Sequence, residues 1–233
     1  MSIAIIKYNA GNTASVANAL LRLGITPTIT DDVAEIRAAS HVIFPGVGHA
    51  QPAMAYLRER GLDTVIRSLT QPFLGICLGL QLLCEWSEEG DTTCIGIFPH
   101  KVRRFPPGEK VPHMGWNHVP LAGTGCEPWR QRIGGLPAPP GIGNQIWDFV
   151  EDSSSYQRVR NFATQLAWPR RLKPHVYYLH AYRADLGPTT IAACDYGGPF
   201  SAIMRKDNFL ATQFHPEKSD KAGARLLRSF VAS

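Results

Sequence analysis

The sequence has few of the features that mark secreted, metal-binding or membrane-spanning proteins. Its five cysteines are odd in number and include no C-x-x-C pair, so they predict neither a disulfide framework nor a zinc site. The apolar run before Lys7 spans four residues, which is too short for a secretory signal or a membrane span. We therefore expect a protein of the reducing cytoplasm without membrane contact, in which a single cysteine is available for chemistry.

Blocks of like charge are absent too. The net charge is +5, and the 24 basic residues are scattered along the chain instead of forming a nucleic-acid arm, so no nucleic-acid partner is expected. Hydrophobic residues make up 44% of the chain and charged residues 18%, which argues against disorder and fits one packed domain of 233 residues.

Short apolar runs alternate with stretches of helical period, a pattern typical of an α/β fold. We expect three layers, with a mixed, largely parallel sheet between helices. The pattern places strands at residues 3–8, 26–30, 41–44, 73–76, 95–98, 176–180, 190–194, 201–205 and 210–214, and helices at 12–23, 51–60, 62–69 and from about 220. Between 121 and 175 glycine and proline are dense, so we expect an irregular, exposed insertion, remote from Cys77, within a single domain 1–233.

The turn around Cys77 has the sequence features of a nucleophile elbow. The string FLGICLGLQLL predicts a buried strand, a tight turn and a helix, the geometry that G-x-S-x-G serves in hydrolases. Gly75 and Gly79 lack side chains, so the turn can form and a substrate can approach the sulfur. The alternative is that Cys77 is a small buried hydrophobic residue, a common fate of cysteine.

His215 and Glu217, in the string FHPE, can supply a base and its orienting acid. Pro216 disfavours a helix at His215, and residues two apart in an extended segment point the same way, so imidazole and carboxylate can meet. His215 would take the proton of Cys77, and Glu217 would hold the imidazole. Without the elbow, the same string could be an ordinary turn at the end of a strand.

The string PGVG after the strand at 41–44 is a candidate oxyanion hole. Gly46 and Gly48 around Val47 let backbone N–H groups turn inward, and the amide of Leu78 behind the nucleophile can join them. The glycines also permit the Gly46–Val47 peptide to rest with its carbonyl inward and to flip when a partner docks. A glycine-rich turn of this kind is more often only a turn.

Together, the strings PGVG, GICLGLQLL and FHPEKS resemble the class I (triad) glutamine amidotransferases. The strings VPHMGWN at 111–117 and YLHAY at 178–182 are similar, more specifically, to the glutaminase subunits of imidazole glycerol phosphate synthase, a family of histidine biosynthesis. The resemblance covers about residues 2–120 and 176–233.

The resemblance implies a reaction, a partner and a role for each site residue. L-glutamine would be hydrolysed to glutamate and ammonia through a thioester on Cys77, without a cofactor. The ammonia would pass to a cyclase subunit, a (β/α)8 barrel in a heterodimer, that makes imidazole glycerol phosphate and aminoimidazole carboxamide ribonucleotide. The implied positions are the triad Cys77, His215 and Glu217, the oxyanion strand Gly46, Val47 and Gly48, Gln81 at the substrate α-amino group, and His180, Ala181 and Tyr182 at its α-carboxylate. Serine is more usual in the family where Ala181 stands, but this contact is made by the main chain.

Other interpretations stay open. A paralogous amidotransferase subunit serving another acceptor, for instance in surface-sugar biosynthesis, would share the triad, and a catalytically silent binding module would share the fold. His113 and His118 could suggest a metal site, but no carboxylate or cysteine joins them at ligand spacing, so no metal is expected. Trp116 belongs either to the core or, by the resemblance, near the docking face.

Overall fold

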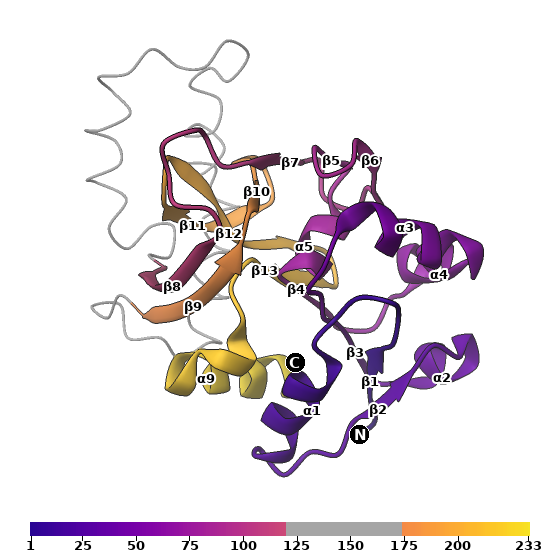
Figure 1. The fold of residues 1–233 in the computed structure, drawn as a ribbon. Helices are drawn as coiled ribbons and strands as arrows, with labels where there is room; N and C mark the ends of the chain where they lie inside the picture. Colours follow the sequence, from indigo (N-terminus) through magenta and orange to yellow (C-terminus); the bar gives the residue numbers. More distant parts are fainter. Residues whose placement is uncertain (120–173) are drawn as a thin grey trace.

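A seven-stranded sheet forms the centre of the structure, a computed structural model that describes residues 1–119 and 174–233 (Figure 1). The strand order is β11-β12-β13-β4-β3-β1-β2. The four pairs among β13, β4, β3, β1 and β2 are parallel, while β11 and β12 extend the sheet with antiparallel pairs. The strands are β1 (Ile3–Ile6), β2 (Thr28–Thr30), β3 (His41–Phe44), β4 (Phe73–Ile76), β11 (Thr190–Asp195), β12 (Pro199–Lys206) and β13 (Phe209–Thr212).

Helices cover both faces of this sheet, which confirms the predicted three-layer α/β fold with a largely parallel sheet. The helices are α1 (Thr13–Leu21), α2 (Val33–Ala38), α3 (Ala50–Glu59), α4 (Leu62–Ser68), α5 (Leu78–Leu83) and α9 (Asp220–Val231), with the short 3-10 helix η1 (Pro216–Lys218). Successive residues of β1 point to opposite faces, so Ala4 and Ile6 join the core under α2 to α5, whereas Ile3 and Ile5 join the core under α1 and α9. Figure 1 shows α1 and α9 together on one side of the sheet, away from α3 and α4.

Two smaller sheets complete the described part of the chain. One has the order β10-β7-β5-β6, and the other is the ribbon β8-β9. Their strands are β5 (Trp86–Ser87), β6 (Thr92–Thr93), β7 (Lys101–Arg104), β8 (His113–His118), β9 (His175–His180) and β10 (Tyr182–Ala184). Of the predicted insertion at 121–175, only the last two residues fall within the described ranges, and His175 already belongs to β9.

The strand predicted at 95–98 is wrong. The backbone N–H groups of Ile95 and Ile97 donate to the carbonyl oxygens of Leu82 (2.8 Å) and Leu83 (2.9 Å), at the carboxyl end of α5. The apolar run therefore closes the end of a helix, where four carbonyl groups need donors, instead of pairing with a strand. Sequence periodicity could not separate these outcomes, because both bury the same side chains.

The sequence pattern did not anticipate helix α2, strand β8 or the short strands β5, β6, β7 and β10. Helix α2 begins at an Asp32 cap whose carboxylate accepts a hydrogen bond from the Glu35 amide (2.9 Å), and the D-x-x-E spacing was a signal for it. Strand β8 pairs with β9 over its whole length. Across residues 1–119 and 174–233, no helix is long and apolar enough to cross a membrane.

Gly223 allows α9 to pack against the turn that carries His215 and Glu217. A Cβ on Gly223 would lie 1.8 Å from the Pro216 carbonyl oxygen. We expect Gly223→Ala to destabilise the fold by about 1–3 kcal/mol through overpacking, and so to lower the unfolding temperature by roughly 3–10 °C in a calorimetric scan. Helix propensity alone favours alanine by about 1 kcal/mol and predicts the opposite sign, so an unchanged or higher unfolding temperature would contradict the close contact.

Candidate active site

Cys77 lies at a strained turn between β4 and α5. Its backbone angles are φ 53° and ψ −106°, a conformation that non-glycine residues rarely adopt, and its amide donates to the Thr212 carbonyl (2.8 Å). The residue is 5% exposed. The turn therefore has the predicted elbow geometry, with the thiol raised above the carboxyl end of the central strands.

Two glycines let the elbow touch the end of β3. A Cβ on Gly79 would meet the Phe44 carbonyl oxygen at 2.0 Å, and a Cβ on Gly46 would meet the Leu78 Cβ at 2.5 Å. No side chain fits at either position. The PGVG turn and the start of α5 are thus in direct backbone contact.

His215 and Glu217 form a buried pair beside this elbow. The His215 Nδ1–H donates to Glu217 Oε1 (2.8 Å), and both side chains are 1% exposed. Burial opposes protonation of His215, but the negative charge of Cys77 and, after it, the hydrogen bond and charge of Glu217 outweigh burial and raise the pKa of His215 to about 10. His215 Nε2 has no hydrogen-bond partner among the described residues. With its pKa raised, His215 holds a proton on each ring nitrogen at neutral pH, and the one on Nε2 is not engaged by a described residue.

Two groups that contact the thiol were missed from the sequence. Gln213 Nε2 lies 3.8 Å from Cys77 Sγ as a donor, and the Leu179 carbonyl lies 3.7 Å from the same sulfur. Gln213 had a signal, since it stands two residues before His215 in an extended segment and so can face the same way. Leu179 had none, because its contact is made by the backbone.

The PGVG turn holds its carbonyl toward the elbow. The Gly46 carbonyl oxygen accepts a hydrogen bond from the Leu78 amide (3.3 Å), and the Val47 carbonyl accepts one from the Gly11 amide (3.1 Å). The Leu78 N–H is therefore already occupied in this arrangement. Gly48 is exposed and has φ +129°, in the region that favours glycine.

The residues expected around the substrate backbone lie next to one another. Gln81 Nε2 donates to the Tyr182 carbonyl (2.8 Å) and to Gln213 Oε1 (3.2 Å). The structure thereby joins Gln81 to the segment His180, Ala181 and Tyr182, and through Gln213 to the thiol. The Ala181 carbonyl accepts from the Phe105 amide (3.3 Å), so this segment is also fixed from its other side.

His113 and His180 form a neutral buried pair behind the segment. His180 Nδ1 bonds to the Tyr182 carbonyl (2.8 Å), which can only accept, so His180 carries its proton on Nδ1 and accepts at Nε2 from His113 Nδ1 (3.1 Å). Burial lowers the pKa of His113 to about 4. Burial also lowers the pKa of His180 to about 3, and nearby positive charges add to this. The described residues contain no group of three or more His, Cys, Asp or Glu side chains that could hold a metal ion.

The opposite face of the β8-β9 ribbon is apolar and open. Trp116 pairs with Tyr177 and Met114 with Leu179, so all four side chains share one face. Trp116 is 54% exposed and Met114 is 61% exposed. Of the two places considered for Trp116, the core is therefore excluded.

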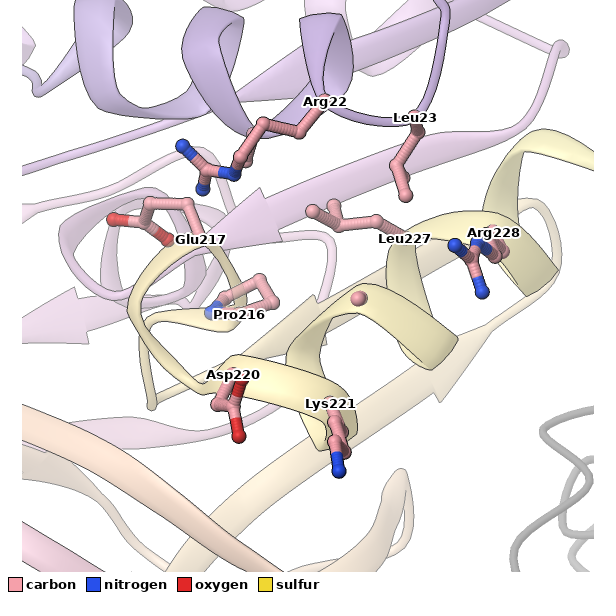
Figure 2. A pocket seen from close by; sticks show the side chains of 10 residues that line it. Arg22, Leu23, Pro216, Glu217, Asp220, Lys221, Leu227 and Arg228 are labelled. Carbon is pink, nitrogen blue, oxygen red and sulfur yellow. The ribbon is translucent and has the colours of Figure 1, made fainter.

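A cavity of about 280 Å³ lies between α1 and α9, behind the triad (Figure 2). Figure 2 shows Arg22 and Leu23, directly after α1, on one side and Leu227 and Arg228 of α9 on the other. The lining reaches Glu217 but includes neither Cys77 nor His215. This cavity is therefore separate from the place where a substrate would meet the thiol.

Known proteins match this chain over nearly its whole length. The family described as glutamine amidotransferase class-I matches residues 4–133. The chain is 42% identical over 234 residues to an imidazole glycerol phosphate synthase subunit HisH of Bacteroides fragilis, with 99% of each chain covered. It is 38% identical over 232 residues to subunit HisH 2 of Legionella pneumophila, which covers 99% of this chain and 97% of that one.

Solved structures show the same fold at lower identity. A glutamine amidotransferase crystal structure superposes with a TM-score of 0.65 at 18% identity, covering 100% of this chain and 98% of that one. The PurLQS structure from Thermotoga maritima gives 0.61 at 14% identity, covering 99% and 97%. The alignments to the HisH relatives also run through residues 121–175, so the relatives carry a counterpart of that stretch.

The buried histidine pair predicts how stability depends on pH. Because His113 and His180 have lowered pKa values in the folded state and an ordinary value of about 6.5 when unfolded, their stabilising effect is complete above about pH 6.5 and is lost as the pH falls toward 4. His215, whose pKa is raised, is protonated in both states below about pH 6.5 and adds no slope there. Each neutral histidine contributes a slope of at most about 1.4 kcal/mol per pH unit.

We therefore expect the unfolding free energy of His113→Gln, measured in urea titrations, to fall less steeply than that of the wild type between about pH 6.5 and 5. The difference in slope should be up to about 1.4 kcal/mol per pH unit. His118→Gln, on the exposed side of the same strand, is the matched control and should leave the wild-type slope in place. Equal slopes for the wild type and His113→Gln would show that His113 is not held neutral.

Proposed function

The chain belongs to the class I glutamine amidotransferases and, among them, to the HisH subunits of imidazole glycerol phosphate synthase, and we propose that Cys77 is the nucleophile of this activity. The protein hydrolyses L-glutamine to glutamate and ammonia, and the ammonia feeds the cyclase step of histidine biosynthesis. The observation that carries the catalytic assignment is the buried hydrogen bond from His215 Nδ1 to Glu217 Oε1 (2.8 Å), next to a Cys77 held at a strained elbow whose negative charge helps to raise the pKa of His215.

In the proposed mechanism the Cys77 thiolate attacks the carboxamide carbon of glutamine. The carbonyl oxygen becomes an oxyanion, and the His215 imidazolium then gives its proton to the departing nitrogen as the C–N bond breaks. Ammonia leaves and a glutamyl thioester remains on Cys77. Neutral His215 next takes a proton from water, the water oxygen attacks the thioester, and Cys77 leaves as thiolate. Glu217 supports the imidazolium and fixes the ring tautomer through its 2.8 Å hydrogen bond.

We assign the substrate backbone to the surroundings of Gln81. Both Nε2 hydrogens of Gln81 are used by Tyr182 and Gln213, which leaves its Oε1 as the acceptor for an α-ammonium group. The main chain of His180, Ala181 and Tyr182, tied to Gln81 and to Phe105, would hold the α-carboxylate. Neutral His180 supports this role, because its hydrogen bonds order this segment and it does not compete with the neighbouring His215 for a proton.

The oxyanion hole requires a change from the arrangement seen. The proposed donors are the amides of Val47 and Leu78, with the glycines Gly46 and Gly48 giving the turn its freedom. In the structure the Gly46 carbonyl occupies the Leu78 amide, so this arrangement is that of a resting enzyme. Rotation of the Gly46–Val47 peptide would withdraw that carbonyl and present the Val47 N–H in its place.

The partner that we propose is a cyclase subunit with a (β/α)8 barrel, forming a heterodimer in the cytoplasm. The open face of Met114, Trp116, Tyr177 and Leu179 is the proposed contact, because exposed tryptophan and methionine are typical of interface centres. The Leu179 carbonyl faces Cys77 Sγ, so a partner on this face would stand close to the point where ammonia is released. The alignment to HisH subunits over the whole chain favours this acceptor over a surface-sugar pathway.

We expect Cys77→Ala to lower glutamine hydrolysis at least about 10³-fold in the complex, because no other group can form the thioester, while the circular dichroism spectrum stays unchanged. Cys84 is the matched control. It is fully buried, its pKa is raised well above the usual value by burial, and its thiol bonds to the Leu80 carbonyl, so Cys84→Ala should retain activity. Labelling of Cys84 in preference to Cys77 by a glutamine-analogue electrophile would sink the assignment.

We also expect the isolated chain to be nearly inactive until the cyclase binds. A missing oxyanion donor costs about 10²–10³-fold in rate, so the chain alone should hydrolyse glutamine slower than the complex with cyclase and cyclase ligand by at least about 10²-fold. The measurement is the rate of glutamate formation under both conditions. Equal rates would reject a partner-gated oxyanion hole even if Cys77 proved to be the nucleophile.

Trp116→Ala tests the proposed docking face in the same assay. It should raise the cyclase concentration needed for half-maximal activation by about tenfold or more, without lowering the rate at saturation. Arg37→Ala on α2, on the other face of the central sheet, is the control and should change neither quantity.

A further inference from the structure

Tyr8 lies beneath the PGVG turn and holds it by a hydrogen bond. The residue follows β1 and is 8% exposed, and its hydroxyl donates to the Pro45 carbonyl (2.6 Å). Its ring packs against Phe44 with centroids 5.1 Å apart. A Cβ on Gly46 would lie 2.7 Å from the Tyr8 hydroxyl oxygen, so the hydroxyl also touches the turn at its glycine.

Three consecutive peptides of the turn have different anchors. The Pro45–Gly46 peptide is held by Tyr8 through the Pro45 carbonyl. The Val47–Gly48 peptide is held through the Val47 carbonyl by the Gly11 amide (3.1 Å). Among the described residues, the Gly46–Val47 peptide between them is held by the Leu78 amide alone, at the longer distance of 3.3 Å.

The two outer anchors come from one segment, the loop between β1 and α1. This loop is itself fixed, since the Lys7 amide donates to the Thr30 carbonyl (2.8 Å) and Asn9 Nδ2 donates to the Pro52 carbonyl (3.1 Å). A peptide between two fixed neighbours can rotate about its own flanking bonds without moving either neighbour. The pattern therefore confines movement to the peptide that carries the Val47 N–H.

We propose that Tyr8 is a positioning residue that, with the Gly11 amide, clamps both sides of the Gly46–Val47 peptide and so aims the Val47 N–H at the oxyanion after the peptide rotates. The clamp rests on the proposed glutaminase function and deepens it. Tyr8 touches neither substrate nor the reacting atoms. It acts through Pro45. Removing the Tyr8 hydroxyl would take away the hydrogen bond that the buried Pro45 carbonyl accepts from it.

The hydroxyl of Tyr8 is suited to this task because it stays protonated. Burial and then the nearby negative charge of Cys77 raise the pKa of Tyr8 far above its ordinary value, so the O–H remains a donor throughout the working pH range. Phenylalanine keeps the ring contact with Phe44 and removes only the donor.

Tyr8→Phe in the complex with cyclase and cyclase ligand is the direct test. We expect kcat for glutamine hydrolysis to fall about tenfold while KM for glutamine stays within about twofold, because an oxyanion donor acts on the transition state and not on substrate binding. The ratio of the hydrolysis rate in the activated complex to the rate of the isolated chain should fall by a similar factor. Synthesis from added ammonia, which bypasses Cys77, should be unchanged.

Tyr56→Phe on α3 is the matched control, since it removes a hydroxyl that is hydrogen-bonded to Asp31 Oδ2 (3.2 Å). It should leave kcat, KM and the activation ratio as in the wild type. If the wild-type complex hydrolyses glutamine but Tyr8→Phe has an unchanged kcat and activation ratio, the clamp is overturned and the glutaminase assignment stands. If the wild-type complex does not hydrolyse glutamine, the proposed function and the clamp both fail.

A second measurement needs no variant. In the ¹⁵N-labelled wild-type chain, binding of the cyclase should change the amide exchange rate of Val47 while those of Gly46 and Gly48 stay within about twofold. Those three amides report the three peptides separately. Comparable changes at all three would overturn the clamp, because the flanking peptides would then move with the central one.

Discussion

The end of β3 and the start of α5 approach each other more closely than any side chain would allow. Glycine at positions 46 and 79 makes this possible, since a Cβ on Gly79 would lie 2.0 Å from the Phe44 carbonyl oxygen. The contact brings the PGVG turn within hydrogen-bond reach of the Leu78 amide. An oxyanion hole shared by the two segments depends on it, because both donors must lie within about 3 Å of a single oxygen atom. The strained conformation of Cys77 at the same elbow is maintained by this packing.

The electrostatic arrangement follows from how little water reaches the elbow. His215 and Glu217 are almost fully buried, and a buried imidazolium is stable only beside negative charge. Glu217 supplies negative charge through its hydrogen bond to Nδ1, and the negative charge of Cys77 also raises the pKa of His215. His180, close to the same ring, receives no carboxylate and remains neutral. Two neighbouring histidines thus differ in charge, and the protonated one is the residue to which we assign proton transfer.

The sequence predicted those features that are set by local chemistry. Strands β3 and β4 were predicted to the residue, because short apolar runs bounded by turn residues have few other solutions in an α/β fold. The elbow geometry also followed from the glycines around Cys77. The segment at 95–98 was misassigned because its backbone donors are used by the end of α5, a tertiary contact that no local pattern records. Tyr8 was missed for the same reason, since its hydroxyl reaches a carbonyl that lies 37 residues away along the chain.

Strand β9 connects the outer face of the molecule to the site through single residues. Tyr177 pairs with Trp116 on the open face, while its carbonyl oxygen accepts a hydrogen bond from the His215 amide (2.9 Å). Leu179 pairs with Met114 on that face, and its carbonyl lies 3.7 Å from Cys77 Sγ. Side chains that a partner would cover are therefore attached to backbone groups that contact His215 and Cys77. A displacement of β9 on docking would reach His215 and Cys77 directly. The PGVG turn is anchored to the loop after β1 and would instead respond through the Cys77 elbow and the Leu78 amide.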